Sequence, residues 1–184
     1  NTDDAMSRYM PLIELPTLHV DGSARAMGQA QGEALRETIV AFVRQRQAAA
    51  RGYLMERKIP SHAFVDTGAR CMAIAEKWDP EGYEEHLGIA QAAGIDPTLL
   101  YAATNMTDIR DVIAYGAGVA DVPLAEQEGC STLLVPPSRT KAGKVLAGQT
   151  WDLNPQDVAF VVAIHRTPES GPETWSITCA GCLS

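Results

Sequence analysis

Cys130 is the residue of this sequence whose type and position best suit covalent chemistry. It follows Gly129 and opens the apolar stretch Ser131–Val135, which is typical of a β-strand. A thiol becomes a nucleophile when a base takes its proton, yet no histidine lies near Cys130 in the sequence. Cleavage of the Gly129–Cys130 bond would supply a base, because the freed α-amino group has a pKa of about 7.7–8.0. From composition alone, the opposing interpretation of a buried, inert strand cysteine is the more common case.

The residues on both sides of Cys130 suit such a cut. Gly129 has no side chain to obstruct attack on its carbonyl, and glycine tolerates a strained backbone. The stretch 116–129 is rich in glycine and acidic residues and predicts an exposed loop. Farther along the chain, a second strand ends in Trp151 and Asp152. Their plain structural interpretations are a core aromatic ring and a carboxylate that caps a turn.

The CAGC sequence of Cys179–Cys182 is a second candidate for chemistry. A CxxC pair serves as a redox motif or as half of a zinc site. No second pair and no histidine cluster completes a tetrahedral site, and residues i and i+3 of a strand point to opposite faces. We therefore expect both cysteines to be structural, with no metal and no cofactor. The four histidines are scattered and show no ligand spacing.

Two compositional halves must position these residues. Residues 23–115 are rich in Ala, Gln, Glu and Arg, whereas the residues from Cys130 onward are rich in Val, Thr, Ile and Gly. Helices followed by strands indicate an α+β protein. Asp21 or Ser23 is expected to cap the first helix and Asp96 the last, Gly94 to end one, and Arg46 to favour a helix dipole near its C-terminal end. We expect helices over residues 23–51, 61–78, 81–93 and 97–115, and strands over residues 131–135, 144–153, 158–166 and 174–182.

Bulk properties restrict the class of protein further. The chain has 184 residues, 46% of them hydrophobic and 21% charged, which suits one globular domain. A net charge of −8 argues against a nucleic-acid surface, because phosphate binding needs clustered lysine and arginine. No apolar run approaches the roughly 20 residues of a membrane span, and the first residues lack a signal-peptide pattern. Four cysteines are too few for a disulfide scaffold, so a cytoplasmic setting is expected.

Several stretches, taken together and in order, resemble the acyl-coenzyme A:6-aminopenicillanic acid acyltransferase family of cysteine N-terminal nucleophile (Ntn) hydrolases. That family has a Gly-Cys-Thr-Thr processing site, followed at similar spacing by a Gly-Gln-Asn-Trp-Asp motif. A Gly-x-x-x-Gly step at Gly28 and Gly32 is similar to its opening helix. The stretches are GCSTLLV from Gly129, KVLAGQTWDLN from Lys144, VAFVVAIHR from Val158, HVDGSARAMGQAQGEALRETI from His19 and GYEEHLGIAQAAGID from Gly82.

The resemblance implies roles for individual residues. Cys130 matches the nucleophile, whose thiol also cleaves the Gly129–Cys130 bond, and Asp152 matches an aspartate that orients or tunes the amine and thiol. Weaker candidates for substrate binding are Ser131 and Thr132, which match the Thr-Thr pair, and Thr150, which stands where the family usually has Asn.

The resemblance also implies a fold, an αββα four-layer Ntn sandwich. Residues 1–129 would form its helical α segment, and residues 130–184 would begin its catalytic β segment. The 55 residues from Cys130 onward allow about four strands, so we expect further polypeptide to supply the remaining strands. The family's oxyanion-hole residue, usually an Asn, falls in that missing part.

The implied activity is that of a self-processing amidohydrolase. It would cleave a small-molecule or peptide amide, or transfer its acyl group, through a thioester on Cys130. Hydrolysis is the simpler outcome. Its partners would be the amide substrate and the processed α and β chains of one precursor, with homo-oligomers left open and no nucleic acid or membrane. The rival interpretation is a non-catalytic α+β binding module with a structural Cys130, and a thiol-redox role for CAGC is a distant third.

Overall fold

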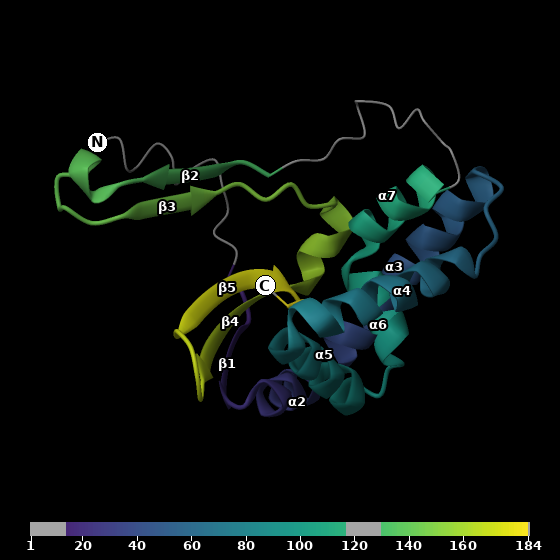
Figure 1. Cartoon of the computed structure of the whole chain (residues 1–184), viewed down its shortest axis with the longest axis horizontal. Coiled ribbons are helices and arrows are strands. Elements are labelled where there is room, and N and C mark those ends of the chain that lie inside the picture. The colour runs from purple at the N-terminus through teal and green to yellow at the C-terminus, as the bar shows by residue number, and fades with distance from the viewer. Residues whose placement is uncertain (1–13, 117–129, 184) are drawn as a thin grey trace.

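The helical half of the chain folds into six α-helices in the computed structural model, which describes residues 14–116 and 130–183 (Figure 1). The helices pack side by side and leave the strands of the second half at one flank. Their bounds are α2 Ala24–Ala34, α3 Arg36–Glu56, α4 Ala63–Trp78, α5 Pro80–Ala93, α6 Pro97–Thr104 and α7 Met106–Gly116.

Local signals account for three of the helix ends. The side chain of Ser23 accepts a hydrogen bond from the Ala26 amide (3.3 Å), and Asp96 accepts one from Leu99 (3.0 Å), so both expected caps are confirmed. Gly94 ends α5 in the left-handed region with φ of 71°. Two expected helices are broken, the first between α2 and α3 and the last at Asn105. The Asn105 side chain donates to the Tyr101 carbonyl (2.9 Å) and so competes with the helical backbone.

Glycines let α2 and α5 lie very close together. A Cβ atom on Gly28 would lie 2.0 Å from the backbone oxygen of Glu85, and one on Gly88 would lie 2.4 Å from that of Arg25. Gly32 faces α5 in the same way, with a Cβ position 2.6 Å from the Ile89 oxygen. The Gly-x-x-x-Gly step of the sequence therefore marks the contact between α2 and α5, and any larger residue there would push the two helices apart.

Strands from both halves of the chain form one sheet. β4 Val161–Pro168 lies in the centre, with β1 Thr17–Gly22 parallel on one side and β5 Thr174–Cys179 antiparallel on the other. The expectation that the first half contributes only helices is incomplete, because β1 belongs to it. The six residues of β1 are too few to show a clear strand pattern in the sequence. Their partner, β4, lies far away along the chain.

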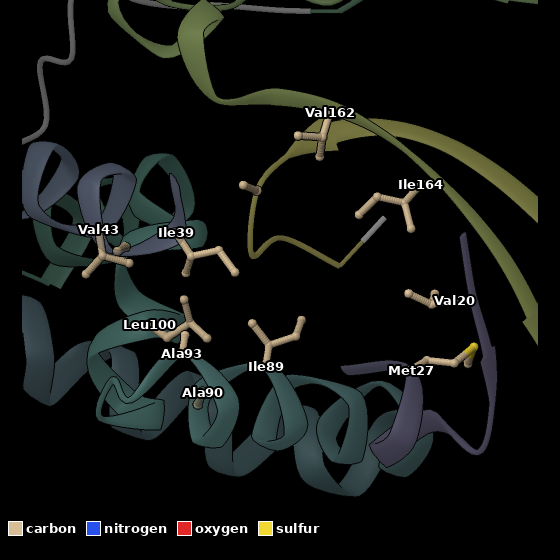
Figure 2. Close-up of a cluster of buried hydrophobic side chains, with 12 residues drawn as sticks. Val20, Met27, Ile39, Val43, Ile89, Ala90, Ala93, Leu100, Val162 and Ile164 are labelled. Atoms are coloured by element: carbon tan, nitrogen blue, oxygen red, sulfur yellow. The ribbon is translucent and has the colours of Figure 1, made fainter. Parts of the chain in front are cut away.

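Helices cover one face of this sheet and build the core there. Val162 and Ile164 of β4 point toward Ile39, Ile89 and Leu100 of the helices (Figure 2), and all five are at most 2% exposed. Burial of each such side chain contributes about 1.5–3 kcal/mol to the free energy of unfolding. The α+β class is confirmed.

The opposite face of the sheet is open. The rings of His19, His165 and Trp175 stack across the three strands, with centroids 4.6 and 4.3 Å apart. Trp175 is 64% exposed and its face neighbour Ile177 is 62% exposed. The described residues therefore show helices on one side of a three-stranded sheet, and no second sheet stacked on it.

The predicted hairpin is present but shorter than expected. β2 Thr132–Val135 pairs antiparallel with β3 Leu146–Gln149, and a short 3₁₀ helix, η2 Pro137–Arg139, lies in its turn. The hairpin extends away from the helices (Figure 1), and residues of both strands are exposed. A second 3₁₀ helix, η3 Pro155–Phe160, replaces the start of the strand expected from residue 158.

Two buried ion pairs join the halves of the chain. Arg46 of α3 contacts Asp157 of η3 with 2.6 Å between Nη2 and Oδ2, and the two side chains are 10% and 3% exposed. Glu85 of α5 contacts Arg166 of β4 with 2.9 Å between Oε1 and Nε. Gln45 adds a hydrogen bond to the second oxygen of Asp157 (2.8 Å). These pairs position η3 and β4 against the helices.

Candidate functional site

Hairpin pairing determines where Cys130 stands. Thr132 pairs with Gln149, and the pairing continues one residue further, because the Thr150 amide donates to the Ser131 carbonyl (2.9 Å). The Ser131 amide in turn donates to the Thr150 hydroxyl (3.0 Å). If this register continued by one more residue, Cys130 would stand opposite Trp151, and Asp152 would follow on the neighbouring strand with its side chain directed to the other face. The two sequence motifs are thus partners across one hairpin.

Cys130 is exposed, so it is not packed as a buried strand cysteine. Gly129, the other side of the predicted processing bond, lies outside the described residues. Ser131 and Thr132 are exposed as well. The Thr150 hydroxyl accepts a hydrogen bond from the Ser131 backbone amide, so this side chain stabilises the end of the hairpin.

Asp152 lines a cavity of about 160 Å³ that both halves of the chain build. From the helices come Arg46 and Asn105, and from the second half come Trp151 and Asn154. Trp151 is 41% exposed, so the expectation of a core aromatic ring is wrong. It follows β3, outside the core, and contributes to one wall of the cavity. The remaining lining residues are Phe42, Thr104, Thr107, Asp108, Leu153, Cys179 and Cys182.

Negative charge exceeds positive charge at this cavity. The guanidinium of Arg46 is neutralised by Asp157. Asp152 and Asp108 are exposed carboxylates, and neither forms an ion pair within the part of the chain that the structure describes. The cavity is therefore electrostatically more favourable for a cation than for an anion.

The CAGC cysteines lie in the wall of the same cavity. β5 ends at Cys179, and Gly181 (φ 88°) turns the chain before Cys182. The expectation that the two side chains point to opposite faces of one strand is therefore wrong. Burial raises the pKa of Cys179 to about 11 and that of Cys182 to about 12. Across residues 14–116 and 130–183, no cluster of three or more potential metal ligands occurs.

The exposure of Cys130 and the burial of Cys179 and Cys182 predict that these thiols react at different rates. At about pH 8 the raised pKa values leave about one part in 10³ of Cys179 and one part in 10⁴ of Cys182 as thiolate. In the folded chain, iodoacetamide should therefore label exposed Cys130 well before either, as mass spectrometry of peptides would show. Labelling in urea, where burial is lost, serves as the control. Labelling of Cys179 in the folded chain as fast as in urea would contradict the described packing.

Sequence reasoning missed the helical side of the site. The sequence pattern indicates a helix-dipole role for Arg46, yet Arg46 falls three and four residues after Val43 and Phe42, on the buried face of α3. A charged residue on an apolar helix face requires a buried partner, and this was the available signal. Asn105 gave no comparable signal, because only the break between α6 and α7 brings it to the cavity.

No protein-family model matches this chain, and no curated protein matches it either. Among the described residues, none of the helices has the length and apolar character needed to cross a membrane.

Proposed function

We propose that this protein is a self-processing cysteine amidohydrolase of the N-terminal nucleophile type. One observation carries the proposal: the hairpin pairs the stretch that follows Cys130 with the stretch that precedes Asp152, Cys130 is exposed, and Asp152 lines a cavity built by both halves. A thiol, a carboxylate and a cavity are the parts that amide chemistry with a covalent intermediate needs.

Maturation would begin in the intact chain. The Cys130 thiol adds to the carbonyl carbon of Gly129, the carbon–nitrogen bond breaks, and the acyl group passes from nitrogen to sulfur as a thioester. Water then hydrolyses the thioester. The products are a carboxylate on Gly129 and a free amine and thiol on Cys130.

Turnover would use the groups that maturation releases. The α-amine takes the thiol proton, and sulfur attacks the substrate carbonyl. The leaving amine departs with that proton, and the remaining thioester passes to water, or to a second amine in the transferase variant. The carboxylate of Asp152 stabilises the ammonium form of the α-amine and so raises its pKa, which favours removal of the thiol proton.

Contacts across the processing bond support the proposal of two chains that stay together after the cut. β1 lies in the first half and pairs along its length with β4 in the second. The ion pairs Arg46–Asp157 and Glu85–Arg166 also connect residues before the processing bond to residues after it.

The four-layer αββα sandwich is part of this proposal. The open face of the sheet at Trp175 and Ile177, and the exposed hairpin, are the surfaces that a second layer of strands would cover. A cytoplasmic location also belongs to it, since all four cysteines are free.

Asp152→Asn tests the carboxylate. The amide is nearly isosteric but uncharged, so processing and turnover should each fall by about 10²-fold or more, while the melting temperature stays close to that of the parent chain. Asp66→Asn, an exposed carboxylate on α4 away from the cavity, is the matched control. Cleavage would be followed by intact mass and turnover by release of 4-nitroaniline from N-acyl anilides. Parental rates in Asp152→Asn would return this residue to a turn-capping role.

A further inference from the structure

The CAGC sequence forms a tight turn at the end of β5. The Cys182 amide donates a hydrogen bond to the Cys179 carbonyl (3.0 Å), and Ala180 and Gly181 occupy the two central positions. Gly181 has φ of 88°, whereas φ of Ala180 is not positive, which is the pattern of a type II turn. The rule that residues i and i+3 of a strand face opposite ways therefore does not apply to these cysteines.

A turn of this kind sets its first and last residues at the spacing of a disulfide. The Cα atoms of residues i and i+3 of a β-turn lie less than about 7 Å apart, and disulfides join Cα atoms about 4.4–6.8 Å apart. Cys179 and Cys182 also line the same cavity, of about 160 Å³. Burial, and after it the negative charge of a Cys179 thiolate, raises the pKa of Cys182, so the two thiols are electrostatic neighbours.

Contacts with the core hold this turn in place. Ala180 is buried, and its amide donates a hydrogen bond to the Phe160 carbonyl (2.9 Å). A Cβ atom on Gly181 would lie 3.1 Å from Cγ2 of Ile39, so the turn packs directly on α3. Two thiols held in this way lose less conformational entropy on forming a disulfide than the same pair in an unfolded chain.

The two thiols differ in their access to solvent. Cys182 is partly exposed, whereas Cys179 is 2% exposed. A small molecule in solution therefore meets Cys182 first. The charged groups that act on both thiols are Arg46 and Asp157, and these two neutralise each other in their buried ion pair.

We propose that Cys179 and Cys182 are a site of reversible oxidation, at which small disulfides of the glutathione type convert the two thiols into an intrachain disulfide. The Cys182 thiolate attacks one sulfur of oxidised glutathione, the sulfur–sulfur bond breaks, and one reduced glutathione leaves. The Cys179 thiolate then attacks the Cys182 sulfur of the mixed disulfide, and a second reduced glutathione leaves. The two electrons and two protons lost by the chain are gained by the glutathione.

The new bond would lie in the wall of the cavity that Asp152 also lines. Oxidation would withdraw the Cys182 thiol from the Thr104 carbonyl, with which it forms a long contact of 4.0 Å. In a reducing compartment such a disulfide is transient and responds to the redox state. The inference does not depend on the amidase proposal, because it concerns different thiols.

The full-length Cys71→Ala/Cys130→Ala variant isolates the CAGC thiols for the test. It would be equilibrated in mixtures of oxidised and reduced glutathione, quenched with acid and labelled with N-ethylmaleimide in urea. Mass spectrometry should show a chain that has lost two hydrogen atoms, carries no glutathione and takes up no maleimide. Its equilibrium constant of formation should be at least about tenfold larger in the folded chain than in urea. In the parent, a peptide map should show the Cys179–Cys182 link.

Cys179→Ser and Cys182→Ser, each made in the same background, are the matched controls. Each keeps one CAGC thiol, so each should stop at a single glutathione adduct. The rate gives a second readout, because thiols with a raised pKa remain mostly protonated throughout the range from pH 7 to 9. Oxidation of the folded chain should therefore accelerate about tenfold per pH unit, whereas in urea it should level off above about pH 8.5.

Three outcomes would overturn the proposal. The first is a stable glutathione adduct, or no oxidation at all, in the variant that keeps both CAGC thiols. The second is an equilibrium constant no larger in the folded chain than in urea, since the turn would then contribute nothing. The third is the same pH profile with and without urea, which would mean that only unfolded molecules are oxidised.

Discussion

Cys130→Ala should leave the chain in one piece and without amidase activity. Alanine has no thiol to attack the Gly129 carbonyl and none to form the substrate thioester, so both reactions should fall to background. The exposed position of Cys130 means that the fold and its melting temperature should be retained. Intact mass separates the outcomes: one mass for the variant, and two for the parent with cysteine as the new N-terminal residue.

Cys71→Ala is the control for loss of a thiol, since Cys71 lies on α4 and does not line the cavity at Asp152. It should process and turn over like the parent. Cleavage between Gly129 and the residue at position 130 in Cys130→Ala would show that another group cuts the chain. A parent chain that stays uncut and inactive would favour the non-catalytic binding module.

Arg46→Met should cost about 3–5 kcal/mol of the free energy of unfolding and lower the melting temperature by about 6–20 °C. Methionine keeps the apolar stem but leaves the Asp157 carboxylate, 3% exposed, without its cation. Arg46→Met combined with Asp157→Leu should recover much of the loss, because no buried charge remains.

Arg25→Met provides the surface comparison for this measurement. Arg25 pairs with Glu84 at 3.2 Å, but the two side chains are 38% and 52% exposed, so this pair contributes about 0–1 kcal/mol. Urea unfolding of the three variants would give the free energies. Equal small losses for Arg46→Met and Arg25→Met would mean that the Arg46–Asp157 pair does not hold η3 against the helices.

Features with local causes could be predicted from the sequence. The caps at Ser23 and Asp96, the helix end at Gly94 and the hairpin each depend on residues within a few positions or on one short turn. The pairing of the GCSTLLV and KVLAGQTWDLN stretches could be predicted for the same reason, because a hairpin brings its two strands together.

Features set by distant contacts could not be predicted. β1 is a strand because β4 pairs with it, and six residues carry too weak a pattern to show this alone. The helical wall of the cavity depends on Arg46 meeting Asp157, more than a hundred residues later. Trp151 is exposed because it follows β3 in a segment outside the core, and an aromatic residue in an apolar stretch does not by itself indicate this.

The buried ion pairs also constrain how the two halves can vary over evolution. Arg46 and Glu85 lie before the proposed processing bond, and their partners Asp157 and Arg166 lie after it. A substitution in one half leaves a buried charge unless the other half changes with it. Homologous sequences should therefore keep both members of each pair or replace both together. Chimaeras joined at position 129 from diverged relatives should assemble only when their pairs match.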